Sequence, residues 1–219
     1  MPDPFPITSA PITSTPIRSA SITPGPSRRP RIYLAGPEVF LPEARRIGEA
    51  KAQLCAAAGF EGIFPLDEQL DLTGLAKRAQ AERIYRADVG IMRSCDLMIG
   101  NLTPFRGVSM DSGTAFEAGF MRALGKPVLG YTNTSLDLRA RAERYRAAAA
   151  AGLCTWPDGD RPDVVVEDFD LAENLMIEMA VVESGYAVVR RTVAAGHEMT
   201  DLAGFAACLA LLGPPAAPV

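Results

Sequence analysis

Short apolar runs alternate with longer stretches of helical spacing, and this alternation restricts the fold more than any other feature of the sequence. Runs that predict strands lie at 32–35, 62–65, 96–101 and 127–131. Helical patterns follow them at 42–58, 75–92, 112–124 and 138–151. Continuous apolar strands alternating with helices form parallel sheets covered on both faces, and right-handed crossovers leave few topologies. We predict a doubly wound α/β domain, flavodoxin-like or Rossmann-like, with about five parallel strands.

The two ends of the chain differ from this pattern. Residues 1–29 are rich in Pro, Ser and Thr and offer too little apolar surface for a core, so we predict a disordered tail. The α/β domain is expected at 30–190, with a C-terminal helix and tail at 191–219. The pattern is weaker after 151, where it predicts a possible strand at 164–166 and helices at 171–184 and 199–212.

Composition excludes several classes of partner. The 219 residues carry a formal net charge of −4 with both signs interleaved, so no basic stripe indicates nucleic-acid binding. No apolar stretch reaches the ~18 residues of a membrane helix, and the amino terminus lacks a secretory signal pattern, so we expect a cytoplasmic protein with no membrane partner. Four widely spaced cysteines read as reduced, buried thiols: Cys55, Cys95, Cys154 and Cys208.

The segment 111–120, DSGTAFEAGF, is the strongest candidate for chemistry. With Ser112 as N-cap, Asp111 stays in the loop and Glu117 lies just past the first helical turn, so both border one pocket at the carboxyl edge of the sheet. Two carboxylates suit glycoside chemistry, which needs an anionic group at the sugar carbon and a proton donor for the leaving group. Helix capping and the helix dipole also favour acids here, and spacing alone prefers that explanation.

Other polar residues are less informative. Asp96 opens an apolar strand and either lies at a pocket mouth or is a turn residue, and the same alternatives apply to Asp67 and Asp88. His197 is the only histidine, which leaves little material for triads or histidine-based metal sites, so no metal is expected. Neither a glycine-rich dinucleotide fingerprint nor a phosphate loop is present, so nicotinamide and triphosphate cofactors are disfavoured and no cofactor is expected.

Three motifs in this order and spacing resemble the nucleoside 2-deoxyribosyltransferase family: YLAGP at 33–37, DLMIG at 96–100 and DSGTAFEAGF at 111–120. The resemblance runs from about residue 31 to 184. It implies exchange of the base of a 2′-deoxynucleoside for a free nucleobase by double displacement with retention. Glu117 would attack C1′, Tyr33 would position Glu117, and Asp96 and Asp111 would contact or protonate the base.

The resemblance also implies a binding set and an assembly. Gln69 matches a base-reading position, and Asn174 and Met176 match an element that reaches the sugar in a neighbouring subunit's pocket. The remaining substrate-binding positions that the resemblance suggests are Gly36, Pro37, Phe40 and Asp67. A homo-oligomer follows, built from dimers and up to a hexamer. Alternatively, Met176 simply joins the apolar face of its helix.

Two other functions remain open from the sequence. In an N-glycoside hydrolase of the same fold, water would replace the acceptor base, and nucleotide-hydrolysing relatives bind a 5′-phosphate that Asp111 would repel. A non-catalytic nucleotide-binding module would keep the pocket without the chemistry. The long amino-terminal tail, Glu38 directly after 36–37, and the last helix depart from the shortest family members.

Overall fold

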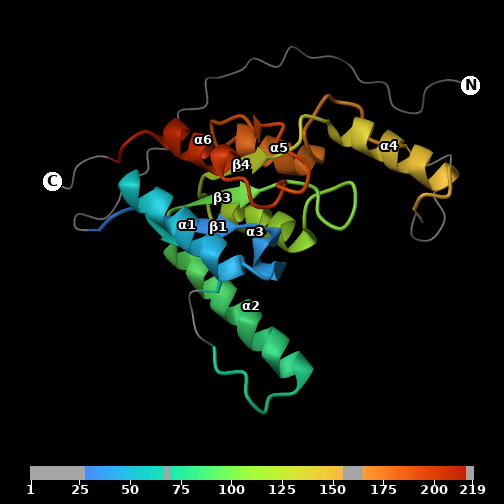
Figure 1. The fold of residues 1–219 in the computed structure, drawn as a ribbon. Coiled ribbons are helices and arrows are strands. Elements are labelled where there is room, and N and C mark those ends of the chain that lie inside the picture. The colour runs from blue at the N-terminus through green and yellow to red at the C-terminus, as the bar shows by residue number, and fades with distance from the viewer. Residues whose placement is uncertain (1–27, 67–69, 155–164, 216–219) are drawn as a thin grey trace, which may run out of the picture.

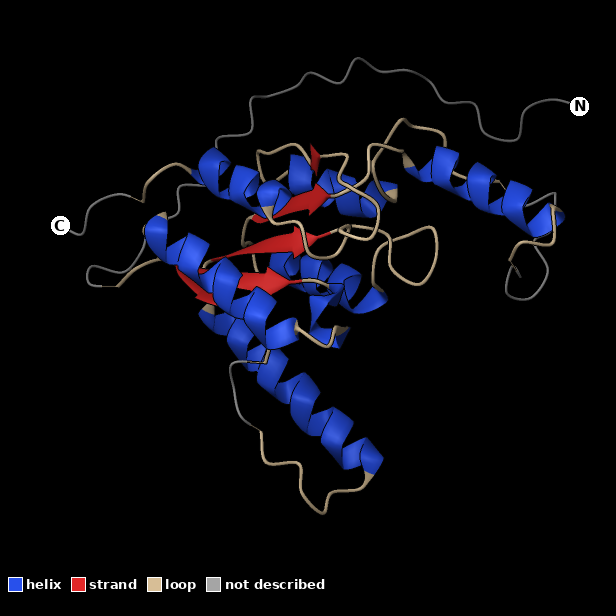
Figure 2. Ribbon diagram, in the orientation of Figure 1, coloured by secondary structure: helices blue, strands red, loops and turns tan. Residues whose placement is uncertain are grey.

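A computed structural model describes residues 28–66, 70–154 and 165–215. Five parallel strands form one sheet in the order β2-β1-β3-β4-β5, with helices on both faces (Figure 1, Figure 2). The strands are β1 (Arg31–Ala35), β2 (Glu61–Ile63), β3 (Leu97–Asn101), β4 (Val128–Thr132) and β5 (Val189–Arg190). This is the flavodoxin-like strand order, and it confirms the predicted doubly wound fold.

The three central strands are the apolar runs that sequence patterning located. Every residue of β3 and β4 is buried, as expected for strands covered by helices on both faces. Between β1 and β3, Ala35 pairs with Gly100, so the carboxyl ends of the two strands are level.

Helices cover the two faces separately. On one face, α1 (Ala44–Ala57) and α6 (Ala203–Leu212) pack over a core that contains Leu34, Ile99 and Phe205. On the other, α2 (Lys77–Ser94), α3 (Ser112–Ala123) and α5 (Leu175–Val182) cover a second core. The 3-10 helix η1 (Pro37–Phe40) follows β1 directly. The helix α4 (Leu138–Ala150) projects from the sheet at the upper right of Figure 1.

Several sequence expectations need correction. The helix expected at 171–184 begins only at Leu175, because the preceding backbone bonds to side chains instead of to the next helical turn. The expected strand at 164–166 is wrong where it can be assessed: residues 165 and 166 form no regular structure, and residue 164 lies outside the described part. The short edge strand β5 was not predicted.

The cysteines and the last helix add to the core. All four cysteines are free thiols; Cys55, Cys95 and Cys208 are buried, whereas Cys154 is half-buried. Phe205 and Cys208 place α6 in the same core as the central strands. Within the described residues, no helix is long and apolar enough to span a membrane.

Candidate active site

The carboxyl edge of the sheet brings together residues at the ends of β1 and β3. Parallel sheets bind ligands at this edge because loops from several strands converge there. Here the edge carries the Gly36–Pro37 turn after β1, Asn101 at the end of β3, and the loop that runs from Leu102 to Asp111 before α3.

Tyr33 and Glu117 form the central contact of this site. Tyr33 is fully buried in β1, and its hydroxyl donates a hydrogen bond of 2.6 Å to Oε1 of Glu117 on α3. Burial raises the pKa of Glu117 to about 7; the Tyr33 hydrogen bond opposes this, and the charges of Asp88 and Asp111 add to it. Burial and the Glu117 charge raise the pKa of Tyr33, so its hydroxyl remains a proton donor in this hydrogen bond.

Asp111 has two roles at the start of α3. It is the N-cap, and its Oδ2 accepts hydrogen bonds from the Thr114 backbone N–H at 3.0 Å and the Thr114 hydroxyl at 3.3 Å. The sequence expectation placed this cap at Ser112, one residue later. The Asp111 carboxylate reaches the third helical N–H, and Ser112 becomes the first helical residue. Capping therefore holds an acid near Glu117.

Asp88 is a site residue that sequence reasoning undervalued. It lies on α2, and its negative charge raises the pKa of both Tyr33 and Glu117, which places it within electrostatic reach of both. A sequence signal existed: Asp88 precedes the buried Ile91 and Met92 by three and four residues, the spacing of one helix face. An acid on the buried stripe of an amphipathic helix indicates a site better than an acid at a turn.

The structure does not bring Asp96 together with Glu117. Asp96 precedes β3 and therefore lies at the amino-terminal edge, where it accepts a two-pronged contact from Arg28 at 2.8 and 2.9 Å. It also accepts the Arg31 backbone N–H at 2.7 Å. Although burial opposes the effect, these hydrogen bonds lower the pKa of Asp96. The turn-residue alternative describes it better than a catalytic role.

Beneath the Gly36–Pro37 turn lies a buried ion pair that the sequence did not predict. Glu38 and Lys51 are both 0% exposed, and Lys51 Nζ lies 2.5 Å from Glu38 Oε1. Asn101 and Tyr131 donate to the same oxygen at 2.9 and 3.0 Å. A Cβ on Gly36 would lie 1.9 Å from the other carboxylate oxygen, so only glycine permits this approach.

Phe40 lies at the surface of the same edge. It is 53% exposed and stacks on Phe105 of the loop after β3, with ring centroids 5.6 Å apart. The Arg106 guanidinium carbon lies 4.8 Å from the Phe40 ring centroid and 4.6 Å from that of Phe105. An exposed aromatic ring at this place suits stacking with a planar ligand.

Asn174 and Met176 lie at the start of α5, and neither forms a hydrogen bond with Glu117. Asn174 is the N-cap of α5: its Oδ1 accepts the Met176 N–H at 3.0 Å, and its amide donates to Glu167. Met176 is 71% exposed. Asp67 and Gln69, the other expected binding residues, lie outside the described residues.

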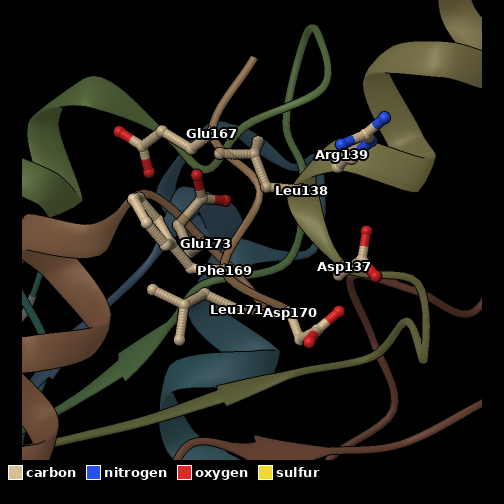
Figure 3. Close-up of a pocket in the computed structure, with 8 residues that line it drawn as sticks. All are labelled: Asp137, Leu138, Arg139, Glu167, Phe169, Asp170, Leu171 and Glu173. Atoms are coloured by element: carbon tan, nitrogen blue, oxygen red, sulfur yellow. The ribbon is translucent and has the colours of Figure 1, made fainter. Parts of the chain in front are cut away.

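A small pocket lies next to this region, between the start of α4 and the segment before α5 (Figure 3). Glu167, Phe169 and Glu173 line it from one side, and Asp137 and Arg139 from the other. None of the residues predicted to bind substrate lines it. Among the described residues, no group of three or more His, Cys, Asp or Glu side chains is arranged to hold a metal ion.

Fold and site together define an α/β protein with a parallel sheet, a carboxylate hydrogen-bonded to a buried tyrosine, and two aspartates within electrostatic reach of that carboxylate. The chain belongs to the nucleoside 2-deoxyribosyltransferase family, whose model matches residues 32–176. This confirms the family resemblance seen in the sequence.

Two solved structures and one curated protein are similar to this chain. The solved 2-desoxiribosyltransferase from Leishmania mexicana is 26% identical, with 83% of this chain and 97% of that chain covered and a TM-score of 0.54. The 2-deoxyribosyltransferase of Bacillus psychrosaccharolyticus is 25% identical, with 46% of this chain and 71% of that chain covered and a TM-score of 0.39. The uncharacterized protein C191.05c of Schizosaccharomyces pombe is 35% identical over 139 residues, which span 63% of each chain.

Proposed function

We propose that this protein is a nucleoside 2-deoxyribosyltransferase, which exchanges the base of a 2′-deoxynucleoside for another free nucleobase. The observation that carries the proposal is the Tyr33–Glu117 hydrogen bond of 2.6 Å, with the charges of Asp88 and Asp111 acting on Glu117. Family membership and the likeness to the Leishmania mexicana enzyme support the same reaction.

The reaction would proceed through a covalent intermediate on Glu117. The ionised carboxylate attacks C1′ and forms a C–O bond, while the bond from C1′ to the base nitrogen breaks and its electron pair leaves with the base. A second base then attacks C1′ and releases the carboxylate. Tyr33 supports the first step because its hydrogen bond favours the ionised, nucleophilic form of Glu117.

The departing base needs a proton, and Asp88 is the better donor of the two aspartates. Asp111 is already engaged as the cap of α3, where its Oδ2 accepts two hydrogen bonds. Asp111 is therefore suited to binding the substrate. Asp88, on α2 within electrostatic reach of Tyr33 and Glu117, would give its proton to the departing base and recover one from the N–H of the incoming base.

The first experiment incubates the protein with 2′-deoxyinosine, with and without adenine, and follows bases and nucleosides by chromatography. Adenine-dependent 2′-deoxyadenosine is expected, and Glu117→Ala should abolish it. Glu49→Ala removes an exposed acid of α1 and should keep full activity. Hypoxanthine release that does not depend on adenine would indicate a hydrolase, and ligand binding without turnover would indicate a binding module.

We also propose that the active site is completed in a homo-oligomer by Asn174 and Met176 of a neighbouring subunit. The support is an exposed apolar surface on α3 and α5, where Phe116 is 50%, Met176 71% and Val182 42% exposed. Exposed apolar side chains on two helices that pack against each other are typical of an interface.

Complementation tests this assembly. Glu117→Ala and a Met176→Glu variant should each be inactive, yet a mixture should regain activity because some hybrid sites combine an intact Glu117 with an intact Met176. Leu211→Glu, on α6 at the opposite face and 52% exposed, is the matched control. A monomer by light scattering, with full activity in Met176→Glu, would contradict the proposal.

A further inference from the structure

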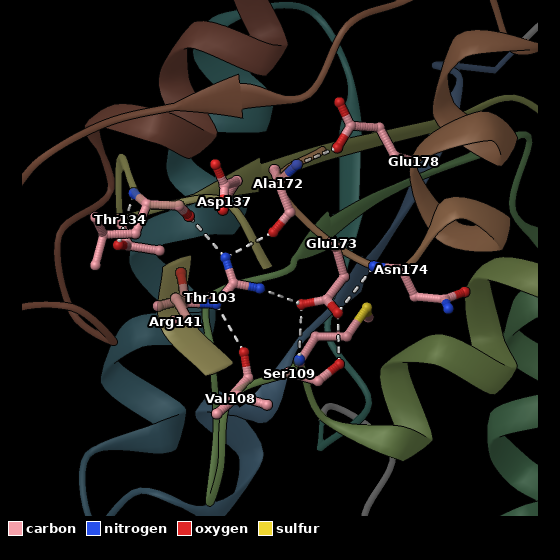
Figure 4. Close-up of polar contacts among 12 residues, drawn as sticks. Thr103, Val108, Ser109, Thr134, Asp137, Arg141, Ala172, Glu173, Asn174 and Glu178 are labelled. Carbon is pink, nitrogen blue, oxygen red and sulfur yellow. Dashed lines mark hydrogen bonds and ion pairs between the residues drawn. The ribbon is translucent and has the colours of Figure 1, made fainter. Parts of the chain in front are cut away.

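Arg141 anchors the outlying helix α4 through its entire guanidinium group. The side chain is 7% exposed and donates to the carbonyl oxygens of Val108 at 2.7 Å, Leu136 at 2.8 Å and Ala172 at 2.7 Å (Figure 4). A fourth contact, of 3.0 Å, reaches Oε2 of Glu173. One side chain therefore joins the loop before α3, the start of α4 and the segment before α5.

Glu173 accepts hydrogen bonds from the loop before α3 and from the N-cap of α5. It is fully buried, and its carboxylate accepts the Ser109 hydroxyl at 2.5 Å and the Met110 backbone N–H at 3.0 Å (Figure 4). It also accepts the Asn174 backbone N–H at 3.0 Å. Ser109 and Met110 lead directly into Asp111, and Asn174 caps α5. The pair thus ties both site-bearing segments to one point.

Net stability is a poor explanation for this arrangement. Removing a guanidinium and a carboxylate from water costs free energy that their mutual attraction often fails to exceed, and apolar replacements are frequently as stable. The pair instead fixes the position of the loop before Asp111 relative to the N-cap of α5. Seven hydrogen bonds of Arg141 and Glu173 hold the two segments in this arrangement.

We propose that Arg141 and Glu173 are positioning residues, which set the location of Asp111 beside Glu117 and of the α5 N-cap that presents Met176. Neither residue touches the reacting atoms. The inference rests on the proposed function, because Asp111 is taken as a substrate-binding residue. A displaced Asp111 would weaken transition-state binding even though Glu117 and Tyr33 keep their own contact.

A double-mutant cycle tests the proposal. Ser109→Ala removes one hydroxyl from the Glu173 carboxylate and leaves the Arg141–Glu173 pair in place, so the protein should fold normally. We expect it to lower kcat/KM about tenfold, the effect of one hydrogen bond to a charged group. In an Asp111→Asn background the same change should cost less than about twofold, because the group that Ser109 helps to position is already impaired.

Controls separate positioning from general stability and from failure of the proposed function. Arg139→Gln breaks an exposed ion pair with Glu143 within α4 and another with Asp168 outside it, and should leave kcat/KM unchanged. Equal effects of Ser109→Ala in both backgrounds would overturn the proposal, as would an equal loss in Arg139→Gln. Should the wild-type protein prove inactive, the proposed function fails by itself, and the same cycle on the Kd for 2′-deoxyinosine still decides the positioning role.

Discussion

The pH dependence of the reaction follows from the environment of Glu117. Its pKa of about 7 means that the nucleophilic, ionised form grows as pH rises, so kcat/KM should increase with pH and reach half its plateau near pH 7. Tyr33→Phe removes the hydrogen bond that lowers this pKa, so the midpoint should move to higher pH. Asp88→Asn removes the proposed proton donor, so kcat/KM should fall across the whole pH range.

The size of the shift in Tyr33→Phe can be worked from the contact. A hydrogen bond to a charged group contributes about 1.5–3 kcal/mol, and one pKa unit corresponds to about 1.36 kcal/mol. Because Glu117 is half-buried, water partly replaces the hydrogen bond of the lost hydroxyl, and the lower end of this free-energy range applies. We expect an upward shift of about one pKa unit in Tyr33→Phe.

The assay is kcat/KM for base exchange measured from pH 5 to pH 9 in buffers of constant ionic strength. An upward displacement of the midpoint in Tyr33→Phe supports the assignment of Glu117 as the titrating nucleophile. A downward or absent shift in Tyr33→Phe would refute the reasoning.

Three further predictions concern stability. Burial raises the pKa of Glu117 above its unfolded value, so its ionisation destabilises the fold as pH rises from about 4.5 to 7. Glu117→Gln should therefore stabilise the protein by ~1–2 kcal/mol more at pH 8 than at pH 5, as measured by urea unfolding. Gly36→Ala should cost about 1–3 kcal/mol, because its Cβ would meet the Glu38 carboxylate, whereas Gly90→Ala, in open space on α2, should add ~1 kcal/mol, both read as Tm shifts. Lys51→Met should cost about 3–5 kcal/mol by leaving Glu38 buried without its counter-ion, and adding Glu38→Gln should recover part of that loss in the same unfolding assay.

Local pattern alone determined much of this protein. The apolar runs at β1, β3 and β4 and the alternation with helices were sufficient to predict a parallel, doubly wound sheet, because burial on both faces leaves its mark on consecutive residues. The motif at 111–120 placed Asp111 and Glu117 at the start of α3, because capping and helical spacing are properties of neighbouring residues.

Only the tertiary structure decided which acids share the site. Asp88 and Asp96 are eight positions apart, and the family resemblance gave a role only to Asp96. In the structure Asp88 lies within electrostatic reach of Glu117, while the strand direction carries Asp96 to the opposite edge. The two-residue strand β5 and the contacts of Glu38 and Arg141 were equally invisible, because each depends on partners far away in sequence. Short-range patterns record which side of an element is buried; long-range packing determines which side chains meet there.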